Sequence, residues 1–391
     1  MNLLDISHKN MLIRKFHKVL EERLKEKMPL IQVLLGPRQV GKTTAAKAIY
    51  DAWNGPKIMA SADSPSPPHA SWIEQHWQQA RLKGAGTLLI LDEVQKVPGW
   101  SEQVKILFDV DRGKTDLRIL LLGSSSLYMQ TGLKESLAGR FELVRAPHWS
   151  FLEFHTAFQW DFNTYLNFGA YPGSVPFIQD EERWRSYILN SIVEPVLGKD
   201  ILGQHTVYQP ALFRQTFELA VQYPAQIVSF QKLLGQLQDR GNAQTIKHYL
   251  TLIEQSFLIL TLQKYSGSTI QSRTSSPKII VLNQALTHAY QSQVRMTKER
   301  EWYGFLFESM IGAHFHQMGN ARLFYWKEGK EEVDYVICMP EQTFAIEIKS
   351  SRRQKTGRGL SFFSKRYPKV ICETWNFDRA LEFLLTGKFI I

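Results

Sequence analysis

Leu-Leu-Gly-Pro-Arg-Gln-Val-Gly-Lys-Thr-Thr, residues 34–44, is the stretch that decides the fold of the N-terminal part of this chain. Its core, residues 36–43, is a complete Gly-x-x-x-x-Gly-Lys-Thr phosphate-binding loop. The apolar run at 31–35 predicts the strand that enters the loop, and residues 45–53 predict the helix that leaves it. Such a loop binds phosphates with consecutive backbone N–H groups and with the positive end of the helix. The stretch therefore predicts nucleotide binding on an α/β fold.

Two residues of the loop have separate expected roles. We expect Lys42 to reach the β- and γ-phosphates of ATP, and the Thr43 hydroxyl to ligate Mg²⁺. The glycines are needed because a Cβ would prevent the backbone from closing on the phosphate. The residues expected to surround the nucleotide are Gly36, Pro37, Arg38, Gln39, Val40, Gly41, Lys42, Thr43 and Thr44.

Thr-Leu-Leu-Ile-Leu-Asp-Glu, residues 87–93, predicts a second buried strand with two acidic residues at its end. We expect Asp92 to hold Mg²⁺ through its water shell and Glu93 to polarise the attacking water as general base. The alternative is an ordinary strand that ends at a charged turn. The phosphate loop upstream favours the functional interpretation.

A third buried strand, residues 117–126, ends in a polar Gly-Ser-Ser-Ser tip. In ATPases with a strand inserted between the phosphate-loop strand and the Asp-Glu strand, this tip lies beside the γ-phosphate. Ser124 or Ser125 is therefore a candidate sensor of hydrolysis, with a helix-capping turn as the alternative. Arg140 is a candidate arginine finger, in cis or in a neighbouring subunit, or else a surface arginine.

From Gly36 to about Phe154 these motifs resemble the AAA+-like P-loop ATPases. They are most similar to a prokaryotic group in which such an ATPase precedes a C-terminal region of poorly assigned function. The resemblance covers most of the chain and is specific for the ATPase. It is carried by Gly-Pro-Arg-Gln-Val-Gly-Lys-Thr-Thr (36–44), Leu-Asp-Glu-Val-Gln-Lys-Val-Pro-Gly-Trp (91–100), Gly-Ser-Ser (123–125), Ser-Leu-Ala-Gly-Arg (136–140), Ser-Phe-Leu-Glu-Phe (150–154) and Gly-Ala-Tyr-Pro-Gly (169–173).

Length and composition indicate a multidomain protein with polyanionic partners. With 391 residues the chain is too long for one ordinary core, and 44% apolar residues are typical of a folded protein. No run approaches the ~18 apolar residues of a membrane span, and the N-terminus has no apolar signal core, so we expect a cytoplasmic protein without membrane contact. The net charge of +10 favours nucleic acid as a partner.

The middle of the chain is predicted to be largely helical. We expect an ATPase core at 1–155, a helical lid at 156–208 and a winged-helix-like module at 209–295. Three helices and a hairpin indicate the winged helix, whose third helix would enter a major groove. That helix carries only Lys247 and His248 as basic groups, so domain packing or oligomer formation is the alternative.

The region 296–391 is predicted to be an α/β domain that resembles the PD-(D/E)XK nucleases. Its strand at 344–349 alternates, with Glu347 and Lys349 on one face, and Asp334 lies on the preceding strand. This resemblance implies that Asp334 and Glu347 hold a second Mg²⁺ or Mn²⁺, that Lys349 orients the water, and that Glu308 completes the metal shell. The domain is expected either to cleave DNA or to keep the fold as a binding platform.

A basic segment follows this motif. Residues 349–369 hold eight basic and no acidic residues, with aromatic residues interleaved. Next to a carboxylate site, a phosphate-binding track is the preferred interpretation and a solvated basic loop the alternative. The residues expected to contact DNA are Lys247, Arg352, Arg353, Lys355, Arg358, Lys365 and Arg366.

Three functions remain open at this level. The leading hypothesis is an ATP-hydrolysing machine that remodels or translocates DNA, including branched DNA, and that assembles as a homo-oligomer, with a ring as one arrangement. The alternatives are an ATP-gated metal-dependent DNA nuclease and a nucleotide-dependent switch that controls a protein partner.

Overall fold

The computed structural model describes residues 12–27, 30–64, 68–124, 127–203, 207–237, 242–266, 275–291, 300–352 and 357–389. The chain forms two compact units, residues 1–147 and residues 148–391. No helix within the described ranges is both long and apolar enough to cross a membrane.

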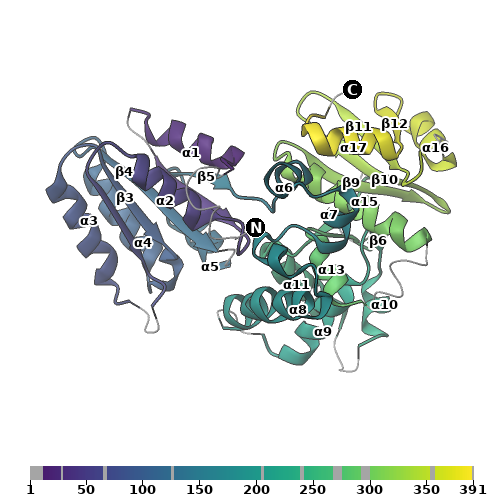
Figure 1. Cartoon of the computed structure of the whole chain (residues 1–391), viewed down its shortest axis with the longest axis horizontal. Coiled ribbons are helices and arrows are strands. Elements are labelled where there is room, and N and C mark those ends of the chain that lie inside the picture. The colour runs from purple at the N-terminus through teal and green to yellow at the C-terminus, as the bar shows by residue number, and fades with distance from the viewer. Residues whose placement is uncertain are drawn as a thin grey trace. The chain divides into compact units, whose positions relative to one another are not determined.

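The first unit is an α/β fold built on a parallel sheet, with its helices flanking the sheet (Figure 1). Every residue of β1 and β3 is buried, as expected of strands covered on both faces. Its elements are α1 (Lys15–Leu24), β1 (Ile31–Gly36), α2 (Lys42–Ala52), β2 (Lys57–Ser61), α3 (Ser71–Lys83), β3 (Thr87–Asp92), η2 (Val94–Lys96), α4 (Trp100–Asp111), β4 (Leu117–Ser124), α5 (Leu127–Glu135) and β5 (Phe141–Arg145).

The strand order of this sheet is β2-β3-β4-β1-β5. Strand β4 therefore lies between the phosphate-loop strand β1 and the Asp-Glu strand β3, which is the inserted-strand arrangement expected from the sequence. Because all five strands are parallel, their carboxyl ends meet at one edge, where α/β folds bind ligands.

The second unit begins with short helices that carry their own caps. Ser150 and Glu153 form a capping box at α6, and Asp161 caps α7. These helices are followed by a long stretch of π-helix at 188–202. The elements are α6 (Phe151–Phe158), α7 (Phe162–Phe168), η3 (Pro172–Phe177), α8 (Glu181–Tyr187), η4 (Ile188–Val193) and η5 (Pro195–Leu202).

A helix–strand–helix–helix–hairpin segment comes next. The short strand β6 was not expected from the sequence, and it pairs with β8 of the hairpin. The two hairpin strands pair antiparallel to each other. The elements are α9 (Pro210–Val221), β6 (Gln226–Ile227), α10 (Phe230–Leu234), α11 (Ala243–Gln255), β7 (Ile259–Lys264), β8 (Lys278–Val281) and α13 (Gln284–Ala289).

The C-terminal part adds strands to the same sheet. The order β12-β11-β10-β9-β7-β8-β6 makes one sheet of seven strands, in which β7 pairs parallel with β9. The hairpin and the C-terminal strands were predicted in separate modules, but they belong to one sheet. The elements are α15 (Arg300–Gln317), β9 (Arg322–Glu328), β10 (Glu331–Cys338), β11 (Thr343–Ile348), α16 (Arg358–Arg366), β12 (Ile371–Trp375) and α17 (Phe377–Thr386).

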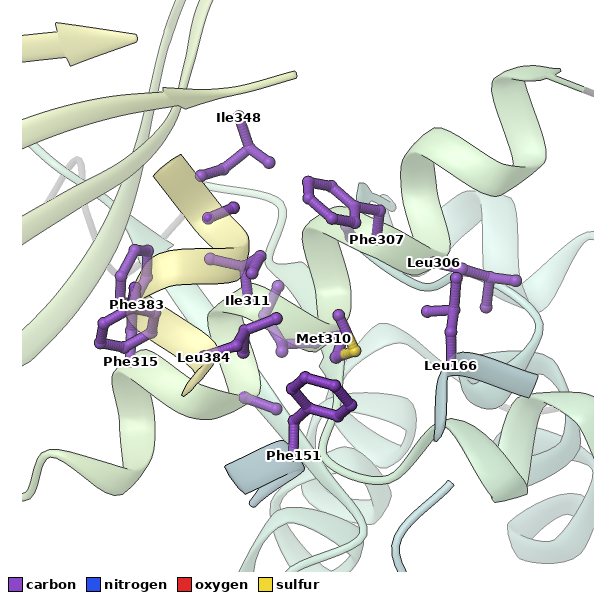
Figure 2. Packing of buried hydrophobic residues seen from close by; sticks show 14 of the residues in the cluster. Phe151, Leu166, Leu306, Phe307, Met310, Ile311, Phe315, Ile348, Phe383 and Leu384 are labelled. Atoms are coloured by element: carbon purple, nitrogen blue, oxygen red, sulfur yellow. The ribbon is translucent and has the colours of Figure 1, made fainter. Parts of the chain in front are cut away.

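The main core of this unit is built around α15, which is buried on most of its circumference. Strand β11 alternates as predicted, because Phe344, Ile346 and Ile348 enter this core while Ala345 packs in a smaller cluster. Figure 2 shows helices α6, α7, α15 and α17 and strand β11 contributing side chains to the main core; the labelled residues are Phe151, Leu166, Leu306, Phe307, Met310, Ile311, Phe315, Ile348, Phe383 and Leu384.

Candidate functional site

The phosphate loop connects β1 to α2, and its glycines are required by the geometry. A Cβ on Gly36 would lie 2.1 Å from the carbonyl oxygen of Ala146, and Gly41 has a φ of +91°. Lys42 then begins a helix of 11 residues, whose first N–H groups have no partner within the helix. These N–H groups are the ones that bind phosphate at a helix N-terminus.

The Lys42 side chain is buried and lies against its own loop. Its Nζ donates to the carbonyl oxygens of Gly36, at 2.9 Å, and Pro37, at 2.7 Å. Both acceptors are neutral, whereas a phosphate would add the attraction between opposite charges to the hydrogen bond. The Lys42 ammonium is therefore placed so that it can turn from these carbonyl oxygens to a bound phosphate.

Asp92 and Thr43 form the oxygen pair expected for Mg²⁺. The Thr43 hydroxyl donates to Asp92 Oδ2 at 3.0 Å. Burial and the neighbouring Glu93 raise the pKa of Asp92, and the Thr43 hydrogen bond and the charge of Lys42 only partly oppose this rise. A hydroxyl and a carboxylate are the hard oxygen ligands that Mg²⁺ prefers, so this donor set fits the ion.

Glu93 is held by its backbone and by one side chain. Its φ of +53° lies in the left-handed region that residues other than glycine seldom adopt, and such strain concentrates at functional sites. Gln95 Nε2 donates to Glu93 Oε2 at 2.5 Å. Gln95 was not identified as a site residue from the sequence, although its place two residues after the Asp-Glu pair was a usable signal.

The tip of β4 lies beside the phosphate loop. Ser124 pairs in register with Gly36, the first residue of the loop. Ser125 lies outside the described residues, and the sensor role of either serine stays a prediction.

Arg140 has a partner in its own chain. Its guanidinium donates to both carboxylate oxygens of Asp109 on α4, with Nε–Oδ1 at 2.7 Å and Nη2–Oδ2 at 2.8 Å. The hydrogen bond from Arg140 lowers the pKa of Asp109. A finger role in a neighbouring subunit, which stays a prediction, would require this exposed pair to open.

The second group of candidate residues lies in the seven-stranded sheet, and the structure adds a lysine to it. Lys278, the first residue of β8, is fully buried. Its Nζ lies 2.5 Å from Glu308 Oε1, 3.3 Å from Glu332 Oε1 and 3.4 Å from Asp334 Oδ1. Burial opposes the charge of this lysine, but Glu308, Asp334 and Glu332 together raise its pKa above its ordinary value. We call Lys278 with these three carboxylates the acidic pocket.

Glu347 and Lys349 pair with each other beside this pocket. Lys349 Nζ lies 2.5 Å from Glu347 Oε1, and the N–H of Gly357 donates to Oε2 at 2.9 Å. Asp334 Oδ2 accepts from the Ile348 N–H at 2.8 Å. Both predicted metal-binding carboxylates are therefore occupied by amides or ammonium groups.

The predicted metal does not fit this arrangement. Within the part of the chain that the structure describes, no group of three or more His, Cys, Asp and Glu side chains is arranged to hold a metal ion. A divalent cation would have to displace the buried ammonium of Lys278, and we derive no chemistry through such an ion. Lys278 and Glu332 were not identified from the sequence.

The predicted DNA contacts that the structure describes are exposed on α11, on α16 and after β11. Lys247 and His248 are exposed on α11, and Arg358 and Lys365 are exposed on α16. Two of the arginines have acidic partners: Arg366 pairs with Glu328, and Arg352 Nε lies 3.3 Å from Asp378 Oδ1. Arg353 and Lys355 lie outside the described residues.

Three family models match consecutive parts of the chain. Residues 29–155 match an AAA domain, residues 159–297 match a domain of unknown function (DUF8612), and residues 303–382 match another domain of unknown function (DUF4143). The first match and the strand order agree, and the first unit is an AAA-type P-loop ATPase domain.

Relatives extend over most of the chain. Two uncharacterized mycobacterial proteins, Mb2031c of Mycobacterium bovis and Rv2008c of Mycobacterium tuberculosis, are each 24% identical over 339 residues, which cover 84% of this chain and 72% of the relative. Among solved structures, the Walker-type ATPase PABY2304 of Pyrococcus abyssi is similar with a TM-score of 0.51 and 14% identity, over 72% of this chain and 96% of that one. At this identity the likeness shows the fold alone.

Proposed function

We propose that this chain is a Mg²⁺-dependent ATPase that couples hydrolysis to the remodelling or translocation of DNA, including branched DNA. The observation that carries the ATPase part is the Thr43–Asp92 hydrogen bond of 3.0 Å beside a complete phosphate loop. It supports a Mg²⁺ site at the loop, because both oxygens belong to the donor set that the ion requires.

Lys42, Glu93 and Gln95 have separate proposed roles in hydrolysis at this site. The bound Mg²⁺ would neutralise charge on the β- and γ-phosphates. Lys42 moves from two neutral carbonyl groups to the phosphates and stabilises the charge that develops on them. Glu93 orients and polarises the attacking water, and Gln95 holds the Glu93 carboxylate in place for that step.

For the DNA-binding part, the exposed face of α16 supports a phosphate track. Arg358, Phe362 and Lys365 recur at helical spacing on this face. Phe362 is 47% exposed and stacks on Trp326 with ring centroids 5.9 Å apart. Cations that bind the backbone, combined with a supported aromatic ring, are the features that single-stranded nucleic acid requires.

The helix–strand–helix–helix–hairpin order at 210–281 supports a winged-helix module as a second contact. We propose α11 as its reading helix, with Lys247 and His248 on the outer face. With so few cations, this module would contribute orientation more than affinity.

We also propose a homo-oligomer, in which a ring is one closed form. On α4, Ile106 is 61% exposed and Val110 is 52% exposed, and both flank the Asp109–Arg140 pair. Exposed aliphatic side chains next to an arginine are suited to a contact with a second copy. Light scattering with and without ATP tests this, and a monomer under both conditions contradicts it.

The deciding experiment measures ATP turnover alone and with duplex, single-stranded and four-way DNA at low salt. We expect at least one form to stimulate turnover, and no turnover in a Lys42→Ala control. No stimulation by any of the three would contradict the DNA part of the proposal. No turnover under any condition would contradict the ATPase part.

A further inference from the structure

The acidic pocket has a resident cation from its own chain. Lys278 is 0% exposed, and its ammonium lies within 3.4 Å of carboxylate oxygens from three side chains. These carboxylates come from two elements, since Glu308 lies on α15 and the other two lie on β10. The lysine itself comes from β8, so three elements converge on one nitrogen atom.

The remaining contacts of this nitrogen leave it well satisfied. Lys278 Nζ also lies 3.4 Å from the Asp334 carbonyl oxygen and 5.6 Å from the centre of the Tyr335 ring. Carboxylate oxygens, a carbonyl oxygen and an aromatic face all attract a cation. A buried ammonium without such partners would be strongly disfavoured, so the pocket is adapted to this charge.

Glu332, at the half-exposed edge of the pocket, also pairs with a second lysine. Glu332 places Oε2 at 2.9 Å from Lys327 Nζ, on the half-exposed side of the pocket. Tyr335 donates its hydroxyl hydrogen to the Glu308 carbonyl oxygen at 2.8 Å and holds α15 against β10. Gly312 permits this approach, because a Cβ there would lie 2.2 Å from the Tyr335 hydroxyl oxygen.

We propose that the Lys278 ammonium is the permanent counter-ion of the acidic pocket and takes the place of a divalent metal ion. It follows that the pocket binds no Mg²⁺ or Mn²⁺ and performs no metal-dependent cleavage of DNA. It follows also that the pocket is a structural junction, which ties the hairpin strand β8 to α15 and β10. This inference is independent of the ATPase and DNA proposals.

The first test measures Mn²⁺ binding to the full-length, nucleotide-free chain by the paramagnetic resonance of free Mn²⁺. A Thr43→Ala background removes binding at the phosphate loop. We expect no Mn²⁺ binding that depends on Asp334 in protein with Lys278 intact, and no cleavage of supercoiled plasmid with Mg²⁺ or Mn²⁺. Binding or cleavage that Asp334→Asn removes would overturn the proposal.

The second test removes the ammonium with Lys278→Met. We expect this variant to unfold at a lower temperature in EDTA than the intact chain, and Mn²⁺ to restore part of the loss by filling the freed position. The matched control is Lys327→Met, which removes a half-exposed lysine that also pairs with Glu332 and should change the unfolding temperature less. A Lys278→Met variant that is as stable as the intact chain would overturn the counter-ion role.

A third variant covers the outcome in which Lys278→Met does not fold. Lys278→Met combined with Glu308→Gln removes the lysine and the nearest carboxylate charge together. We expect this double variant to be more stable than Lys278→Met alone, since fewer uncompensated charges remain buried. A double variant that is equally or less stable would contradict the proposed pairing.

Discussion

Two buried lysines of the described chain, Lys42 and Lys278, lie in surroundings that are built in opposite ways. At the phosphate loop, Lys42 bonds to neutral carbonyl groups, and Asp92 accepts from a hydroxyl. In the acidic pocket, Lys278 contacts the carboxylates directly. The first arrangement uses weak internal partners that a nucleotide and its metal can replace. The second arrangement pairs an ammonium with carboxylates, so the opposite charges balance within the protein. The first site is therefore suited to binding a ligand, and the second to holding the fold together.

The largest expected effect tests the phosphate-loop site. Glu93→Gln should leave ATP affinity unchanged and lower kcat by about 10²–10⁴, the typical contribution of a general base. Binding and turnover are measured separately, by titration with a fluorescent ATP analogue and by phosphate release. Glu74→Gln, on the exposed side of α3, is the control and should hydrolyse normally. Near-normal turnover by Glu93→Gln would refute the assignment of the base.

The comparison is sharpest when both lysines receive the same substitution. Lys42→Met should abolish nucleotide binding with less loss of stability than Lys278→Met, because the two hydrogen bonds of Lys42 go to neutral carbonyl oxygens. Lys278→Met should lower the free energy of unfolding by about 3–5 kcal/mol, the usual result when one partner of a buried ion pair is removed. Urea unfolding of both variants measures this. Equal losses in the two variants would remove the distinction between the sites.

Acid should weaken the second unit through His314. Burial lowers the pKa of His314 to about 4, and its Nε2 accepts the Phe151 N–H at 3.0 Å. The folded state therefore binds fewer protons than the unfolded state between pH 4 and about 6.5. Stability is full above pH 6.5 and decreases as the pH falls toward 4, by about 3 kcal/mol in total.

The variant His314→Gln tests this assignment, because glutamine keeps an acceptor but does not titrate. It should flatten the dependence of the urea midpoint on pH between 4 and 6.5. The control is His248→Gln on the exposed face of α11, which should leave the dependence unchanged. An unaltered slope in His314→Gln would show that another group is responsible.

The smallest expected effect concerns the exposed face of α16, which we propose as a DNA contact. Lys365→Gln should reduce the slope of log K against log salt concentration by about one unit, since one phosphate contact is lost. Fluorescence anisotropy with labelled DNA at several salt concentrations measures the slope. Lys18→Gln, an exposed lysine of the first unit, should leave the slope unchanged. A slope that Lys365→Gln does not change would place the DNA elsewhere.

The phosphate-loop site was predictable because its residues lie in short contiguous sequence motifs. The spacing from Gly36 to Thr43 fixes the loop, and the apolar run before Asp92 and Glu93 identifies a buried strand. Parallel strands then bring these motifs to one edge without further information. Gln95 needed the structure, because its contact depends on the left-handed turn at Glu93.

The acidic pocket was only half predictable. The sequence identified Asp334, on the strand before β11, and Glu308, on the helix before that strand, but it did not identify Lys278 and Glu332. Lys278 is 30 residues before Glu308 in the chain, and the pairing of β7 with β9 brings the hairpin toward β10. Long-range strand pairing leaves no local pattern, although a lysine at the head of a fully buried strand was an unused signal.

The pairing between β7 and β9 has a consequence for how this chain can be divided. The two domain families of unknown function meet between residues 297 and 303, yet their strands hydrogen-bond within one sheet. In this chain, either matched region on its own would present a bare strand edge, which invites aggregation. We therefore expect the two matched regions of this chain to fold as one unit, and either region expressed alone to aggregate.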